Sequence, residues 1–553
     1  MAWSALWNEI MASEPCGDDF ATTAAPSERV EGRDRASVWM LPLVLLIAIV
    51  WLFRTPYVAS NLDATPDAVE YSVSPVQLLT NGRYQIILEG RSLPPRYPPW
   101  FSTLVILPAY MVLGVEPGNA IWPITLFAVA GVACGWAIGR RVSSTAGGLF
   151  SALALMFIPS YGAWATQIMT DVPCVTLMLA TCLVFLRLRS EKRAPHLALF
   201  FGAGLLVALT TLFRSTFAAM IVPFLIAAWT SRNAFLRRSA VFLAPMAVAM
   251  GATLLYNSAT FGSPWRNGYH FWAPVPYDYP NLVFSAGNVT MNLSFLGQTA
   301  FPLLFLACVG VWILERVRKP GAVATESEPF RSLLLFLGLT NAPILIFHLL
   351  YFYPADRFFL PLLAGAAVVL GSIMGRLIFT KRETVLWSIL VAASLFVVAG
   401  KLVSTEPIPN RRLAVERIKQ WTPEDALVIS SVDPVYLENQ LGRGSRRQII
   451  PTSRDVEYAS SLLAPKRVDH PVPPPSSWLD GRAPGVIRGG AINAVQFVAS
   501  EQIDTLVAYV AQGKRLFIET GLVDTVEIPV IERLKQRFTL EPVTDALYEL
   551  KSR

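Results

Sequence analysis

Runs of about 20 apolar residues recur along most of this chain, and they constrain its fold more than any other feature. A transmembrane helix needs roughly 20 consecutive apolar residues. Of the 553 residues 53% are hydrophobic and only 15% are charged, a composition that is rare in soluble proteins. The sequence therefore predicts an α-helical, polytopic membrane protein with about eleven spans. The expected spans are residues 38–53, 119–139, 145–162, 171–188, 196–213, 216–230, 239–257, 297–316, 332–352, 358–378 and 384–403.

Short basic segments between the apolar runs predict how the chain is oriented. Arg29, Arg33 and Arg35 precede the first run, and "GRRVSS", "RLRSEKR" and "GRLIFTKRE" follow later runs. Cytoplasmic loops of membrane proteins are enriched in Lys and Arg. We therefore expect a cytoplasmic N-terminus and an extracytoplasmic C-terminus. Orientation in the membrane accounts for the net charge of +7, and no nucleic-acid partner is expected.

The apolar segment 99–114 complicates this topology. A full crossing there would place the later basic segments outside, against the bias toward cytoplasmic Lys and Arg. We expect the segment to lie in the membrane interface or to re-enter the membrane; a short true span is the alternative. The long N-terminal tail, which carries several acids, argues against a cleaved secretory signal and for a retained first helix.

Three parts of the chain differ in composition and pattern. Residues 1–37 are expected to form a cytoplasmic tail, and residues 38–403 a transmembrane domain with a large first outer loop at 54–118. In residues 404–553 the apolar period switches between about 3.6 and 2, as in "AVERIKQW" and "DALVISS". Helical and strand periods in one segment predict an extracytoplasmic α/β domain.

Six ionisable residues are expected near the outer membrane boundary. Asp67 and Glu70 lie in the first outer loop, and Asp171 begins a span. Arg214 lies between two apolar runs, and Asp356 and Arg357 lie in a tight outer turn. Ionisable groups at membrane depth are costly and usually have a partner or a function. Each also has a structural explanation. The aspartate of the span can cap its helix, the arginines can extend to lipid headgroups, and the two acids of the loop can form a solvated face.

The sequence offers little evidence for a metal or a nucleotide. It contains neither a cluster of His, Cys, Asp and Glu at metal-ligand spacing nor a glycine-rich loop of the kind that binds phosphates of nucleotides. No metal ligand is predicted, the cofactor stays unknown, and a divalent metal is possible without being required. A soluble nucleotide is not expected as a substrate.

The first outer loop resembles that of the C-type glycosyltransferases, membrane enzymes that use polyprenyl-phosphate sugars. Their pattern is an acid pair, a tyrosine a few residues on, a glycine one amphipathic helix later, and Pro-Pro at the start of an apolar helix. Here Asp67, Tyr71, Gly82 and the "YPPW" of residues 97–100 occupy these positions. Within the class, the chain is similar to the protein O-mannosyltransferase and lipid A aminoarabinose transferase group.

Later segments extend this resemblance to about residues 50–400. Asp171, before proline in "TDVP", matches the second acid of the family. Arg357 matches an arginine that an aromatic residue and a proline follow. The segment "YNSATFGSPWRNGYHFW", which contains Tyr269, resembles a loop of many bacterial members.

Two positions depart from the family pattern. Ala68 stands where the second acid of the pair is usual, and Tyr97 stands where His or Lys often precedes Pro-Pro. Glu70 can take the place of the missing acid, and Arg96 is the nearest cation. We therefore expect either that phosphate recognition is rearranged or that activity is lost.

The resemblance implies a glycosyltransferase that acts on the extracytoplasmic side of the plasma membrane. Its donor would be a polyprenyl-phosphate sugar and its acceptor a hydroxyl group of a protein, a lipid or a glycan, in contact with membrane lipids. Asp67 is implied as the catalytic base, Asp171 as a second catalytic acid, and Arg357 as the ligand of the donor phosphate. Further substrate contacts are expected from Glu70, Tyr71, Arg96, Tyr97, Arg214 and Tyr269.

Two other functions stay open. A transporter or flippase of lipid-linked sugars would need polar residues deep in its spans and access from both sides, whereas these apolar runs carry few charges. A non-catalytic member of the fold is compatible with Ala68 and Tyr97. A single cavity roughly 10 Å across, lined by Asp67, Asp171 and Arg357, would favour the enzyme.

Overall fold

The computed structural model describes residues 66–377 and 411–553 with several gaps, together with positions 45, 48 and 49. All of these residues belong to one compact unit, Val44–Arg553. The predicted span 384–403 lies outside the described residues, as does most of the span 38–53. The gaps are residues 89–90, 116, 191–195, 230–233, 273–276, 318–327, 443–444, 452–499 and 522–527.

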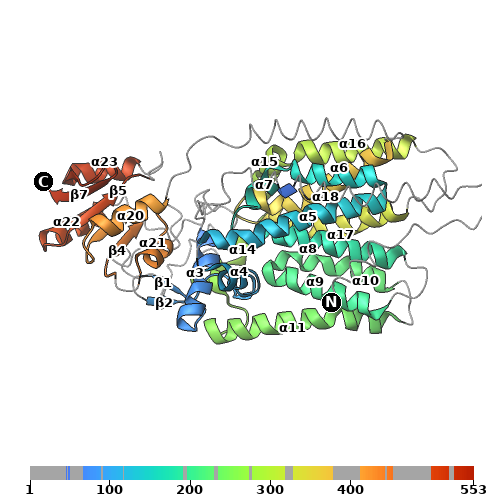
Figure 1. The fold of residues 1–553 in the computed structure, drawn as a ribbon, viewed down its shortest axis with the longest axis horizontal. Coiled ribbons are helices and arrows are strands. Elements are labelled where there is room, and N and C mark those ends of the chain that lie inside the picture. Colours follow the sequence, from blue (N-terminus) through green and yellow to red (C-terminus); the bar gives the residue numbers. More distant parts are fainter. Residues whose placement is uncertain are drawn as a thin grey trace, which may run out of the picture. The chain divides into compact units, whose positions relative to one another are not determined.

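Long apolar helices make up most of the fold, and Figure 1 shows several of them running side by side. Each of the five longest coincides with a predicted span, so the predicted helical membrane architecture is confirmed. The number of eleven spans is not tested by the described residues. The helices long and apolar enough to cross a membrane are Gly118–Val142, Asp171–Ser190, Phe235–Phe261, Glu328–Leu350 and Asp356–Arg376. They contain α5 (Ile121–Val142), α8 (Asp171–Ser190), α11 (Phe235–Phe261), α17 (Glu328–Leu350) and α18 (Leu360–Leu377).

Other predicted spans are shorter or broken helices. The span predicted at 145–162 ends at Met156, because the chain leaves the helix before Pro159, whose ring occupies the first turn of the next one. The span predicted at 297–316 is part of a helix pair bent by 79°. The shorter helices are α6 (Thr145–Met156), α7 (Pro159–Trp164), α9 (Leu197–Phe213), η4 (Ser215–Met220), α10 (Ile221–Trp229), α12 (Gly268–Trp272), α14 (Pro280–Val283), η6 (Ala286–Asn288), α15 (Val289–Thr299) and α16 (Phe301–Val317).

Small residues allow α6 and α18 to pack closely. A Cβ atom at Gly371 would overlap the backbone of Ser151, and one at Gly375 would overlap the backbone of Gly147. Helices in membranes associate through such small residues, because apolar side chains gain little by leaving lipid. The Ser151 hydroxyl also donates to the carbonyl of Val368 at 3.1 Å. This contact fixes α18, and with it the turn that precedes α18.

The first outer loop folds into a buried helix, a hairpin and a short apolar helix. In α3 (Pro66–Asn81) most residues from Asp67 to Gln77 are buried, although the sequence is polar. The apolar segment predicted to lie in the interface forms a helix of only 12 residues, Ser102–Leu113. This is shorter than a crossing requires. The other elements of the loop are β1 (Ile86–Leu88), β2 (Arg91–Leu93), η2 (Ser102–Ile106), α4 (Leu107–Leu113) and η3 (Pro117–Ala120).

The described residues after 410 form a mixed sheet with four helices. Its strand order is β4-β3-β5-β7-β6; β3 runs parallel to β4 and β5, whereas β7 runs antiparallel to β5 and β6. The strands are β3 (Leu427–Ser430), β4 (Gln448–Pro451), β5 (Leu516–Glu519), β6 (Phe538–Pro542) and β7 (Leu547–Ser552). The helices are α20 (Arg411–Trp421), α21 (Pro434–Leu441), α22 (Ser500–Ala511) and α23 (Ile528–Arg537).

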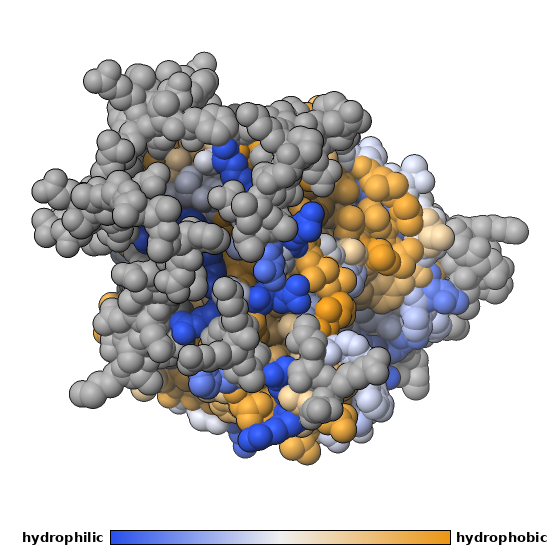
Figure 2. Space-filling model, turned by 90° about the vertical axis from the view of Figure 1, so that its right-hand side faces the viewer, coloured by the Kyte–Doolittle hydropathy of each residue, from blue (hydrophilic) through white to orange (hydrophobic). Residues whose placement is uncertain are grey.

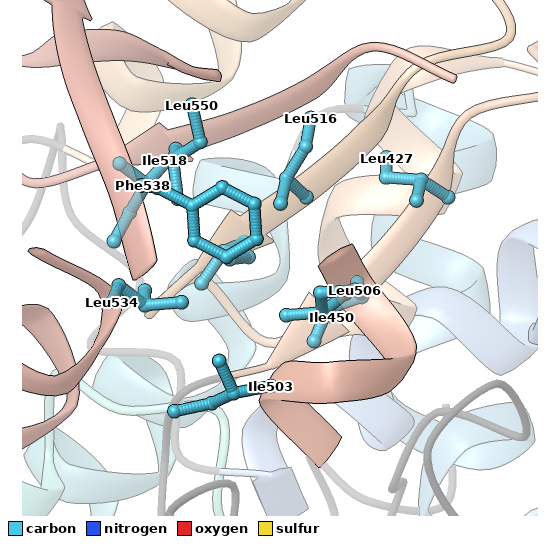
Figure 3. Packing of buried hydrophobic residues seen from close by; sticks show 10 residues of the cluster. Leu427, Ile450, Ile503, Leu506, Leu516, Ile518, Leu534, Phe538 and Leu550 are labelled. Atoms are coloured by element: carbon cyan, nitrogen blue, oxygen red, sulfur yellow. The ribbon is translucent and has the colours of Figure 1, made fainter. Parts of the chain in front are cut away.

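Apolar side chains from the sheet and two of its helices form one core. Figure 3 shows Phe538 of β6 and Leu516 of β5 pointing toward Leu506 of α22 and Leu534 of α23. All four side chains are almost fully buried, which is what holds this segment together. That it forms a separate domain outside the cell stays a prediction.

Basic residues mark one end of the helix bundle. Arg141, in the last turn of α5, donates to Ser190 at the end of α8 at 2.6 Å. Arg376, near the end of α18, donates to the carbonyl of Val142 at the end of α5 at 2.7 Å. The ends of three helices with basic last turns therefore meet. Figure 2, which faces the right-hand side of Figure 1, shows hydrophilic residues in patches among hydrophobic ones.

Candidate active site

The first turns of α3 carry three of the predicted site residues on one face. Asp67 lies in the first turn, and Glu70 and Tyr71 follow three and four residues later, a spacing that places side chains on the same side of a helix. Asp67 is 9% exposed, and Glu70 and Tyr71 are buried. The solvated face considered for the two acids is therefore not what the structure has.

Asp67 forms an ion pair with Arg357, which lies 290 residues away in the chain. Nη2 of Arg357 donates to Oδ2 of Asp67 at 2.7 Å, and Nη1 of Arg96 lies 3.7 Å from Oδ1. Burial by itself raises the pKa of Asp67, but the two guanidinium groups and a hydrogen bond from Tyr97 lower it to about 2. Asp67 is thus ionised at neutral pH and held between two cations.

Glu70 holds Arg96 in place. Its Oε2 accepts from the backbone N–H of Arg96 at 2.6 Å, and its Oε1 accepts from Nε at 3.2 Å and Nη2 at 2.9 Å. The side chain of Glu70 is fully buried and does not line the cavity described below. The structure places Glu70 behind Arg96, away from any substrate that the cavity would hold.

Asp171 and Arg214 form a second ion pair in the same region. Asp171 begins α8, and its Oδ1 accepts from Nη1 of Arg214, which follows α9. In the described part of the chain the carboxylate accepts from no N–H group of α8, so Asp171 does not cap its helix. The guanidinium of Arg214 lies 4.9 Å from the ring centre of Phe358, next to Arg357. Neither arginine extends away from the bundle, as a lipid-headgroup contact would require.

Three tyrosines form one wall beside these pairs. The rings of Tyr71 and Tyr97 stack with their centres 4.5 Å apart, and Tyr97 meets Tyr269 edge to face at 5.6 Å. The guanidinium of Arg96 lies over both Tyr97 and Tyr269. Burial raises the pKa of Tyr71 and of Tyr97 well above the usual range, so both hydroxyls stay protonated. Tyr97, a departure from the family pattern, is thereby integrated into the site.

The segment after α11 closes over Arg96. Gly262 ends α11 with φ of 75°, and Asn257 donates to the carbonyl of Pro264 at 3.2 Å. Trp272 of α12 donates to the carbonyl of Pro94 at 2.9 Å. Gly268 packs so closely that a Cβ there would overlap the backbone of Arg96. This segment therefore helps to fix the position of Arg96, in addition to Glu70.

Gly268→Ala is expected to displace Arg96 and to destabilise the protein by about 1–3 kcal/mol, the usual cost of overpacking. Thermal unfolding of the purified variant would measure the loss of stability. Gly251→Ala is the matched control, because a Cβ at this helical position meets nothing within 4 Å. Equal behaviour of the two variants would contradict the close approach at Gly268.

These side chains line one cavity of about 660 Å³. A cavity of this size is in the range that binds small molecules. Asp67, Asp171 and Arg357 all line this cavity, as expected from their predicted position at the outer membrane boundary. Of the predicted site residues only Glu70 is missing from its walls; the others are Asp67, Tyr71, Arg96, Tyr97, Asp171, Arg214, Tyr269 and Arg357. The roles of these residues stay predictions.

Several lining residues were not predicted as site residues. Trp164 and Asp356 meet in the wall beside Arg357, and Tyr277 meets Tyr351 through a hydrogen bond of 2.6 Å between their hydroxyls. The signal for Asp356 was its position directly before Arg357 in "PADRFF". The described residues contain no group of three His, Cys, Asp or Glu that could hold a metal ion.

Residues 95–256 match the family model described as dolichyl-phosphate-mannose-protein mannosyltransferase. This range includes Arg96, Tyr97, Asp171 and Arg214 but not Asp67. No curated protein matches the sequence of the chain significantly.

Two solved structures share the fold over almost the whole chain. ArnT from Cupriavidus metallidurans, bound to undecaprenyl phosphate, is 12% identical, with a TM-score of 0.57 over 93% of this chain and 98% of that one. The archaeal oligosaccharyltransferase AglB from Archaeoglobus fulgidus, in complex with an inhibitory peptide and a dolichol-phosphate, is 11% identical. Its TM-score is 0.50 over 94% of this chain and 74% of that one. The predicted resemblance to C-type glycosyltransferases is confirmed.

Proposed function

We propose that this chain, which has the fold of the C-type membrane glycosyltransferases, transfers a sugar from a polyprenyl phosphate to an acceptor hydroxyl. The observation that carries the proposal is the pairing of Asp67 with Arg357 inside a cavity of about 660 Å³. The pair combines a group that accepts a proton with a group that binds phosphate. Both are what the transfer of a sugar from a phosphate needs.

Asp67 is the base in this proposal. As the acceptor oxygen attacks the anomeric carbon, its proton passes to the carboxylate of Asp67. The bond between the anomeric carbon and the phosphate oxygen breaks, and polyprenyl phosphate leaves with the electron pair. Arg357, with Arg214 and Arg96 nearby, stabilises the negative charge that gathers on the phosphate. Asp171 keeps Arg214 in the cavity wall through their ion pair.

Donor binding also prepares the base. Arg357 pairs with Asp67 and, together with Arg96, lowers its pKa to about 2, and a carboxylate with so low a pKa is a weak base. A donor phosphate that takes over Arg357 weakens this pair. The pKa of Asp67 then rises, because the effect of burial is no longer offset. Sugar transfer would therefore follow donor binding in a fixed order.

This exchange predicts a change in pH dependence. A base works only when it is deprotonated, so activity is lost as pH falls through its pKa. In the free protein the pKa of Asp67 is about 2, so the acid limb of kcat/KM is expected below the usual assay range. Arg357→Gln removes the nearest cation but keeps the burial, so the acid limb of its residual activity is expected to move to higher pH. If the activities of the wild type and of Arg357→Gln fell at the same acidic pH, this would argue against Asp67 as the base.

The site and the basic helix ends lie at opposite ends of α8. Asp171 is its first residue, whereas Arg187 and Arg189 lie in its last turn, about 25 Å apart at 1.5 Å per residue. Because Lys and Arg favour the cytoplasmic side, we place the site on the extracytoplasmic face of the plasma membrane. The C-terminal sheet would then be an extracytoplasmic α/β domain beside the first outer loop.

Reporter fusions test this topology. A fusion after Arg193 is expected to report the cytoplasm, and one after Arg553 the outside. The two positions serve as internal controls for one another. An external reading after Arg193 together with a cytoplasmic reading after Arg553 would indicate that residues 99–114 form a full span, so that the predicted site residues would no longer share the outer face.

A transfer assay tests the function itself. Purified protein in lipid vesicles is given undecaprenyl phosphate carrying a radiolabelled sugar, with protein, lipid and glycan acceptors from the cell envelope. The proposal predicts label on an acceptor together with release of sugar-free undecaprenyl phosphate. Movement of the intact labelled donor across the vesicle membrane without cleavage would instead indicate a flippase.

A further inference from the structure

Asp356 and Trp164 form a polar and aromatic corner in the cavity wall. Nε1 of Trp164 lies 3.3 Å from each oxygen of Asp356, and the backbone N–H of Arg357 donates to Oδ1 at 2.8 Å. Both residues line the cavity and are only half-buried. Unlike Asp67 and Asp171, Asp356 has no ion pair within the part of the chain that the structure describes. A carboxylate has about four acceptor positions, so these two donors leave it room for more.

The corner lies where the sugar of a bound donor would be. Arg357 follows Asp356 in the chain, and its guanidinium lies 5.4 Å from the ring centre of Trp164. In a polyprenyl-phosphate sugar, one oxygen atom separates the anomeric carbon from the phosphorus. A phosphate on Arg357 therefore brings the sugar ring within a few ångströms of this corner.

We propose that Asp356 and Trp164 are the sugar-binding subsite of the donor, where Asp356 accepts hydrogen bonds from sugar hydroxyls. The inference rests on the proposed function, because it takes the phosphate of the donor to be on Arg357. Sugar hydroxyls are neutral donors, and a carboxylate accepts from them more strongly than a neutral group does. The indole ring of Trp164 offers an apolar face for the C–H groups of the ring, and its N–H holds the carboxylate toward the cavity.

The experiment compares protein variants with donors that lack single hydroxyls. Binding of undecaprenyl-phosphate mannose, glucose, galactose and glucosamine to the purified protein identifies the sugar that it binds most tightly. A series of that donor with one hydroxyl removed at a time is then bound to the wild type and to Asp356→Asn. Trp164→Phe, which keeps a ring but loses the N–H, is the second variant. Asp278→Asn is the control, because Asp278 is an exposed carboxylate paired with Arg266 outside the cavity.

Asp356→Asn is expected to weaken binding of the full donor about 10- to 100-fold, the range for a hydrogen bond to a charged group. Removing one particular hydroxyl should weaken binding to the wild type by a similar factor but have little further effect on the variant. This non-additivity is what a direct contact produces. Sugar-free undecaprenyl phosphate should bind equally well to the wild type and to Asp356→Asn. Trp164→Phe should weaken binding of the full donor less than Asp356→Asn does, and it should not weaken binding of the sugar-free lipid.

Three results would overturn the subsite. Additive effects for every hydroxyl would mean that Asp356 contacts none of them. Equal losses for the donor and for sugar-free undecaprenyl phosphate would mean that Asp356 only supports Arg357. If the wild type preferred a donor with an amino sugar and Asp356→Asn did not, Asp356 would recognise an ammonium group and not sugar hydroxyls. If wild type binds neither lipid, the proposed function itself fails, which is a different result from each of these.

Discussion

Asp67→Asn is expected to lower the rate of sugar transfer by about 10²- to 10⁴-fold, the usual cost of losing a general base. The asparagine keeps the shape of the side chain and its hydrogen bond from Arg357, but it takes up no proton near neutral pH. The measurement is transfer from an undecaprenyl-phosphate sugar by the purified variants in lipid. Binding of undecaprenyl phosphate should survive, because the substitution leaves Arg357 in the cavity and removes the carboxylate that competes for it.

Two further variants test whether the loss of transfer is specific to the carboxylate of Asp67. Asp278→Asn, which removes an exposed carboxylate outside the cavity, should leave transfer unchanged. Glu70→Gln should cost less than Asp67→Asn, since Glu70 acts on the substrate only through Arg96. A larger loss in Glu70→Gln than in Asp67→Asn would mean that the base has been assigned to the wrong carboxylate.

Arg357→Ala is expected to lower transfer by about 10²- to 10³-fold, the range for removing one group that stabilises transition-state charge. It should also weaken binding of sugar-free undecaprenyl phosphate, because the guanidinium is the cation nearest to the base. Arg357→Lys should restore only part of both, since an ammonium group is a point charge and does not reproduce the planar fork of a guanidinium. Transfer rates and lipid binding of the two variants, measured side by side, test this.

Loss of folding is the competing explanation for the alanine variant, because it leaves Asp67 without its nearest cation. Thermal unfolding of Arg357→Ala and Arg357→Lys resolves the two effects. We expect the lysine variant to unfold at a temperature close to that of the wild type and still to transfer sugar slowly. Wild-type transfer by the alanine variant would exclude Arg357 from the donor site.

Much of the fold could be predicted, because long apolar runs have few alternatives to a helix. The helices at residues 171–190 and 235–261 coincide with predicted spans. The interruption between Met156 and Pro159 was not predicted, because hydropathy does not distinguish a continuous run from a broken one. Proline at the start of the second piece was the local signal.

Most residues of the site could be predicted from the sequence, but the ion pairs that they form could not. Spacing within α3 placed Asp67 and Glu70 on one face, yet spacing does not reveal that one pairs with Arg357 and the other with Arg96. Those pairs depend on contacts between distant segments. For the same reason Glu70 was expected to contact substrate, whereas in the structure its carboxylate accepts three hydrogen bonds from Arg96 and does not line the cavity.

Tyr97 illustrates how a departure from a family pattern can be misjudged from sequence. A tyrosine in place of a cation suggested a damaged phosphate site. In the structure Tyr97 stacks on Tyr71 and hydrogen-bonds to Asp67, while Arg96 beside it supplies a cation to the cavity. The side chains around a substitution decide its effect, and they come from other parts of the chain.

An experimental structure of this protein with undecaprenyl phosphate bound would show most directly whether donor and base meet in this cavity. We expect the phosphate inside the cavity, with its oxygens about 2.7–2.9 Å from the guanidinium of Arg357. We also expect Asp67 to have separated from Arg357 and to face the space where an acceptor hydroxyl would lie. A phosphate bound elsewhere, with the Asp67–Arg357 pair intact, would contradict the proposal that donor and base meet in this cavity.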